Sequence, residues 1–245
     1  MTPFDAQAAI DRALDYPYDV VEGTFLFESG VFQPFPETLG DVLARRRPVL
    51  ALGSNGSRTK LRALFDEPAE RHVIPIVRSV LHDFDVVYSA HLTRYGALPA
   101  ALAPSAGTSV TISVLYLTDL ELEKLHGTEA LGRNYDFARL RGIRLEVPGI
   151  EPLSEAYVYV TRHGLLAEGG APVALDAVRA EGRRYPSMTE REILTRSLAI
   201  FPEVRGLEGF IVENVRDAAR RAARTARLRR DAIAPEIAGL EVLEG

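Results

Sequence analysis

The spacing of apolar residues divides the chain into a β-rich centre and two largely helical ends. Between Pro48 and Val160, short apolar runs rich in β-branched residues predict strands. We expect strands at residues 49–52, 108–117, 139–149 and 155–164, and two strands joined by a loop within 73–90. Gly107 is expected to bound the strongest of these strands. Residues 23–32 alternate like a further strand or hairpin.

Apolar residues at helical spacing predict several helices around this centre. Thr118 is a good N-cap because acidic residues follow it in the first turn, where the helix dipole favours negative charge. The expected helices are residues 4–14, 34–48, 58–65, 118–125, 173–184, 189–201 and the long run 209–230. We therefore expect an N-terminal extension (1–47) that packs on a β-rich domain (48–186), followed by a helical C-terminal extension (187–245).

Composition and charge narrow the classes of function. The 245 residues carry a net charge of -5, so nucleic acid is not the default partner. The chain has no cysteine, which excludes disulfides, thiolate metal sites and a cysteine nucleophile. No basic leader with an apolar core opens the sequence, and no apolar run approaches the roughly 20 residues of a membrane helix. We expect a cytoplasmic protein with no membrane partner.

The strand at 49–52 ends in Gly53-Ser54-Asn55-Gly56-Ser57, followed directly by a helical pattern. This order favours a strand-to-helix turn over a hairpin. One interpretation is a loop whose backbone N–H groups hold a carboxylate or phosphate. The other is a tight turn in which Ser57 caps the following helix. The spacing is not that of a Walker loop, and both interpretations stay open.

Three other features are candidates for chemistry. Glu129 lies just past the predicted helix 118–125 and is either a general acid/base or an exposed surface glutamate. The stretch 82–85, His-Asp-Phe-Asp, would alternate its side chains across a strand, so we expect no metal site there. Seven arginines between Arg216 and Arg230 could contact nucleic acid or another anionic surface. Alternatively they form a solvated helix face whose alanines pack inward.

The order of these pieces resembles the γ-glutamylcyclotransferase-like family over residues 48–165. That family has a Tyr-Gly-Ser-Asn stretch after its first strand, which corresponds here to residues 52–55 with leucine at Leu52. A strand and helix follow at 105–125, and then a Leu-x-x-x-Glu with a later tyrosine, here Leu125, Glu129 and Tyr135.

The resemblance implies an α+β fold, a small mixed β-barrel with flanking helices and a cavity at its mouth. It implies that the loop holds a γ-glutamyl group while the substrate α-amine attacks its own γ-carbonyl. Glu129 would take a proton from that amine and pass it to the leaving amine, releasing 5-oxoproline. The implied substrate-binding residues are Leu52, Gly53, Ser54, Asn55 and Tyr135. The implied transferase or lyase reaction needs no metal and no cofactor.

A second hypothesis remains open. Leu52 replaces the family tyrosine, and His126-Gly127-Thr128 replaces the acidic residues that usually precede the glutamate. A non-catalytic protein that binds a small molecule or anion on the same barrel is consistent with both departures. The sequence identifies neither the substrate nor the oligomeric state.

Overall fold

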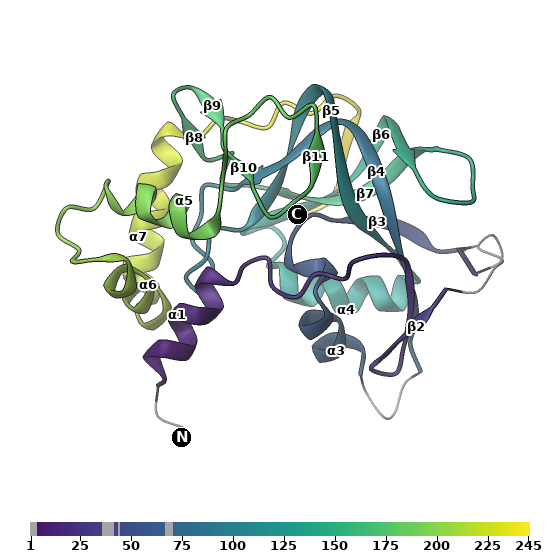
Figure 1. Ribbon diagram of the computed structural model, residues 1–245, viewed down its shortest axis with the longest axis horizontal. Helices are drawn as coiled ribbons and strands as arrows, with labels where there is room; N and C mark the ends of the chain where they lie inside the picture. Colours follow the sequence, from purple (N-terminus) through teal and green to yellow (C-terminus); the bar gives the residue numbers. More distant parts are fainter. Residues whose placement is uncertain (1–3, 36–41, 44, 67–70) are drawn as a thin grey trace.

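The fold is built on a long antiparallel hairpin of β4 (Val73–Tyr88) and β5 (Ala100–Leu117). The computed structural model describes residues 4–35, 42–43, 45–66 and 71–245 (Figure 1). Three further strands complete a ring with this hairpin in the order β5, β3, β7, β6, β4 and back to β5. They are β3 (Arg47–Ala51), β6 (Tyr135–Glu146) and β7 (Leu153–Thr161). The result is a closed five-stranded barrel in which only the β3–β7 pair is parallel.

Six α-helices flank the barrel within the described residues. They are α1 (Ala6–Leu14), α3 (Arg58–Phe65), α4 (Asp119–Glu129), α5 (Glu190–Leu198), α6 (Leu207–Arg216) and α7 (Ala218–Leu228). Figure 1 shows α1 gathered with α5, α6 and α7 on one side, while α3 and α4 lie together below the barrel. In the part of the chain that is described, no helix combines the length and apolar character that crossing a bilayer requires.

Strands from both ends of the chain pair with the barrel. The hairpin of β1 (Phe25–Glu28) and β2 (Val31–Pro34) joins through β1 to β4. The C-terminal strand β13 (Leu240–Glu244) pairs with β6. The core lies inside the ring, where residues such as Val77, Val114 and Val158 are fully buried. A second apolar cluster packs α3 and α4 against the outside of the barrel.

Most of the predicted elements are confirmed, but two strand boundaries were wrong. Residues 73–90 hold one continuous strand instead of two, because Asp83 adopts a positive φ of 63° and forms a bulge in place of a loop. Gly107 lies inside β5 and does not bound it. Its N–H donates to Asp83 Oδ1 at 2.8 Å, so the two irregular positions support each other.

The predicted helix 173–184 was also wrong. The segment forms the short strands β10 (Ala174–Leu175) and β11 (Ala180–Glu181), followed by β12 (Ser187–Met188). The long helix 209–230 is broken at Asp217, whose side chain caps α7 by accepting the Arg220 N–H at 2.9 Å. Seven of the fifteen residues of the helix expected at 34–48 lie outside the described residues, and its expected ends were wrong, because Pro34 belongs to β2 and Arg47 begins β3.

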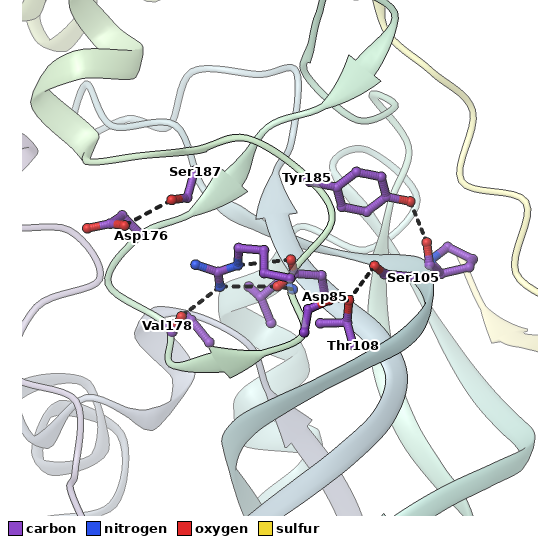
Figure 2. A network of polar contacts seen from close by, with 11 residues as sticks. Asp85, Ser105, Thr108, Asp176, Val178, Tyr185 and Ser187 are labelled. Atoms are coloured by element: carbon purple, nitrogen blue, oxygen red, sulfur yellow. Dashed lines mark hydrogen bonds and ion pairs between the residues drawn. The ribbon is translucent and has the colours of Figure 1, made fainter.

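A polar network around Asp85 explains why residues 173–188 do not form a helix (Figure 2). Asp85 is fully buried in β4 and receives two hydrogen bonds from Arg183, at 3.0 and 3.2 Å. Arg183 also donates to the Val178 carbonyl at 2.7 Å, and Tyr185 donates to the Pro104 carbonyl. These long-range contacts hold the segment across the β4–β5 hairpin. They outweigh the local helix propensity of the segment.

The side chains of His82 and Asp85 contact different partners and do not meet at one point. His82 contacts Ser109 and Glu146, whereas Asp85 faces Arg183. Across the described ranges, no group of three or more histidine, aspartate or glutamate side chains has the arrangement of a metal site.

Candidate active site

One large cavity of about 1640 Å³ opens beside the barrel, and all six residues implied by the family resemblance line it. Its wall is built from the segment around α1, the loop after β3, the end of α4 and one face of α7. The cavity thus brings together Leu52, Gly53, Ser54, Asn55, Glu129 and Tyr135, which come from distant parts of the chain.

The loop after β3 forms the predicted turn between a strand and a helix. Ser54–Gly56 form a single 3₁₀ turn, and Ser57 caps α3 by accepting the Lys60 N–H at 3.2 Å. The helix cap is therefore confirmed. Residues 53–55 nevertheless line the cavity, and within the described chain the N–H groups of Ser54 and Asn55 donate no hydrogen bond. These two donors are available to a ligand.

Glu129 is the last residue of α4, not a loop residue as predicted, because the helix runs four residues further than its apolar pattern suggested. Its side chain is only 8% exposed. Oε1 accepts hydrogen bonds from Lys60 Nζ at 2.6 Å and from Thr128 Oγ1 at 3.1 Å. No described residue donates to Oε2, which leaves that oxygen able to accept a proton.

Lys60 connects the glutamate to the loop, and sequence reasoning missed it. Its ammonium group lies 2.6 Å from Glu129 Oε1 and 2.5 Å from Asn55 Oδ1. A lysine in the first turn of a helix is unfavourable beside the positive end of the dipole. That unfavourable placement was the one signal in the sequence that this lysine has a specific partner.

Tyr16 is a second cavity residue that the sequence did not reveal. Its buried hydroxyl accepts the Ala100 N–H at 2.7 Å, and it contacts Gly53 so closely that a β-carbon there would overlap it. Burial raises the pKa of Tyr16 well above the ordinary 10.0, so the phenol stays neutral. The segment after α1 thus brings a phenol to the loop in which Leu52 lacks one.

We expect Tyr16→Phe to destabilise the protein by about 1–3 kcal/mol, because the buried Ala100 N–H loses its acceptor. Urea unfolding measures the change. Tyr157→Phe is the matched control, since the Tyr157 hydroxyl makes no hydrogen bond within the described chain. Equal effects of the two substitutions would contradict the role given to the Tyr16 hydroxyl.

Glu190, the first residue of α5, is a buried carboxyl group behind Tyr16. One oxygen accepts the Leu98 N–H at 2.7 Å, and the other has no partner among the described residues. Burial raises the pKa of Glu190 well above its ordinary 4.5. The folded protein therefore holds this proton at pH values where the unfolded chain releases it.

The sign of the resulting pH dependence can be measured with Glu190→Gln. Above the ordinary pKa of 4.5, the wild-type protein should lose about 1.4 kcal/mol of stability per pH unit until the raised pKa is passed. The glutamine variant lacks this loss, so its stability relative to wild type should increase as the pH rises above 4.5. Glu208→Gln, at an exposed position on α6, is the control. A difference that stays constant with pH would contradict the prediction.

Two stacked histidines form the inner wall near Tyr135. The rings of His91 and His163 lie 4.3 Å apart, and Tyr135 meets His91 edge-on at 5.6 Å. Burial lowers the pKa of His91 well below 6.5. Burial and the nearby charges of Arg229, Arg162 and Arg133 lower the pKa of His163 to about 4. Both imidazoles are therefore neutral at pH 7.

The strand pairing defines a small closed β-barrel with flanking helices, and a single cavity joins its glycine-containing loop to a buried glutamate. No family model matches the chain, and no curated protein matches it. The chain is 24% identical to the Arabidopsis thaliana protein At5g39720.1, whose solution structure it matches with a TM-score of 0.35 over 48% of this chain and 70% of that one.

A second solution structure, of At3g28950.1 from the same plant, is 20% identical with a TM-score of 0.33. That match covers 47% of this chain and 61% of the other. The closed ring of strand pairings, and not either similarity, defines the fold of this chain.

Proposed function

We propose that the protein is a γ-glutamylcyclotransferase-like enzyme that cyclises the γ-glutamyl group of a small substrate to 5-oxoproline and releases the amine. The observation that carries the proposal is the buried Glu129, joined through Lys60 to Asn55 of the loop. This arrangement supports a site in which a general base and a set of backbone donors face the same ligand.

The proposed chemistry uses this chain's own groups. The free N–H groups of Ser54 and Asn55 hold a substrate oxygen and stabilise the charge that develops on it. The substrate α-amine attacks its own γ-carbonyl carbon, forming the ring C–N bond. Glu129 Oε2 takes the proton from that amine. The bond to the leaving nitrogen then breaks, and Glu129 returns the proton to that nitrogen.

Alignment supplies much of the expected acceleration, because the amine and the carbonyl belong to one molecule. Lys60 fits this scheme as a positioning residue. It fixes one carboxylate oxygen and leaves the other for the proton. Tyr135 and the neutral histidine pair line the same cavity without adding charge.

The test is release of 5-oxoproline from a panel of γ-glutamyl amines, amino acids and phosphorylated conjugates, with free amine measured in the same samples. Equal amounts of the two products are expected. Release of neither product from any compound would overturn the proposed reaction.

A second candidate function has its own support. Lys60 already neutralises Glu129, so the same cavity is suited to binding an anion through the loop without turnover. Calorimetric titration with the γ-glutamyl panel separates the two functions: binding without 5-oxoproline release is the result expected of a binding protein.

A further inference from the structure

The cavity lining contains six arginines without acidic partners. No carboxylate in the described part of the chain forms an ion pair with any of them. They are Arg12, Arg94, Arg133, Arg191, Arg221 and Arg229. A concentration of unneutralised guanidinium groups in a concave site favours an anionic ligand.

On helix α7, arginines that pair with a carboxylate lie beside arginines that do not. Arg220 and Arg224 both pair with Glu213. Arg221 of α7 and Arg229, the residue directly after the helix, instead line the cavity. The expectation that the alanines of this helix pack inward was wrong. Arg224, Thr225 and Leu228 are its buried residues, and exposed small residues such as Ala222 and Ala226 line the cavity between the two arginines.

Both of these cavity-lining arginines are held in place without being neutralised. Arg221 donates to the Asn214 carbonyl, and Arg229 donates to the Arg162 carbonyl at 3.3 Å. Backbone carbonyls position a guanidinium group but leave its full charge in the cavity. Arg133, in the turn after α4, lines the same cavity.

The size of the cavity leaves room for a ligand larger than a γ-glutamyl group. Its volume of about 1640 Å³ exceeds the roughly 300–1,000 Å³ of a typical small-molecule pocket. The loop, Glu129, Arg133, Arg221 and Arg229 all line this one cavity.

We propose that Arg133, Arg221 and Arg229 form a subsite for a multiply charged anionic group of the phosphate class, carried by the amine part of the substrate. The subsite itself follows from the cavity, whereas its assignment to the leaving amine rests on the proposed function. The substrate class is then a γ-glutamyl conjugate of a phosphorylated amine. Planar, fixed guanidinium forks suit phosphate oxygens because they donate two parallel hydrogen bonds.

Equilibrium binding of inorganic pyrophosphate tests the subsite independently of any reaction. We expect the wild-type protein to bind pyrophosphate more tightly than succinate, and more weakly as salt is raised. Arg221→Gln/Arg229→Gln should weaken pyrophosphate binding by at least about tenfold, because hydrogen bonds to charged groups are lost. Arg133 lies in the turn after α4 and not near α7 in the sequence. Arg133→Gln should also weaken pyrophosphate binding.

Arg220→Gln is the matched control on the same helix, since Arg220 pairs with Glu213 and does not line the cavity. Its pyrophosphate affinity should equal that of wild type. Absence of pyrophosphate binding, equal weakening in the control, or tighter binding of a short oligonucleotide than of pyrophosphate would each overturn the subsite.

The two proposals fail in different ways. Pyrophosphate binding together with no 5-oxoproline from any γ-glutamyl compound would refute the reaction and leave the subsite standing. Turnover that is equally fast on neutral and phosphorylated conjugates would refute the assignment of the subsite to the leaving amine.

Discussion

Glu129→Gln is expected to reduce 5-oxoproline release by about 10²–10⁴-fold, the usual contribution of a general acid/base. Glutamine has the same size and keeps an oxygen that can accept from Lys60 and Thr128. It cannot take up the proton that Oε2 is proposed to receive. Substrate binding should change far less than kcat, because the loop and the arginine subsite remain intact. Initial rates and calorimetric affinities measure the two quantities separately.

Glu123→Gln is the matched control, since Glu123 is an exposed glutamate on the same helix. It should have wild-type rates. If Glu129→Gln released 5-oxoproline as fast as wild type, Glu129 would not be the acid/base, and the buried Lys60–Glu129 pair would be a structural contact only.

Arg183→Met is expected to cost about 3–5 kcal/mol of stability, because it leaves the Asp85 carboxylate buried without its cation. Asp85 is fully buried, and its remaining hydrogen bond comes from the adjacent Val86 N–H at 2.8 Å. The methionine side chain retains much of the apolar stem of arginine, so lost packing contributes little. Urea unfolding gives the free energy.

Two further variants isolate the cause. Arg184→Met changes a neighbouring exposed arginine and should be nearly neutral. Asp85→Asn/Arg183→Met removes the uncompensated charge and should recover part of the stability. If the double variant lost as much stability as Arg183→Met and Asp85→Asn lose together when measured singly, the ion pair would not explain the loss.

The parts of the fold that were predicted correctly depend on neighbours in the chain. Ser57 and Thr118 each accept a backbone N–H three residues away, so their capping roles follow from a few residues of sequence. The alternation of apolar residues in the predicted strands can likewise be read from the residues of each strand alone. The predicted helix 173–184 was wrong because its conformation depends on Arg183 reaching Asp85, a partner 98 residues away.

Some residues of the candidate site were predicted from local motifs, and others were not. Its loop and its glutamate were identified from ordered motifs, but the placement of Glu129 in a loop was wrong by one helical turn. Tyr16 and the cavity-lining arginines of α7 were missed, because no local pattern assigns them a partner. Lys60 was missed because its unfavourable place in the first helical turn does not say which distant residue it contacts.

The sequence by itself determined the β-rich centre, the strand, turn and helix around Asn55, and the capped helix that leads to Glu129. These features rest on contacts within a few residues, which a linear pattern records. Only the tertiary structure decided that Lys60 meets Glu129 across 69 residues and that Tyr16 meets Ala100 across 84. Closure of the barrel brings these residues together, and closure depends on all five strands at once.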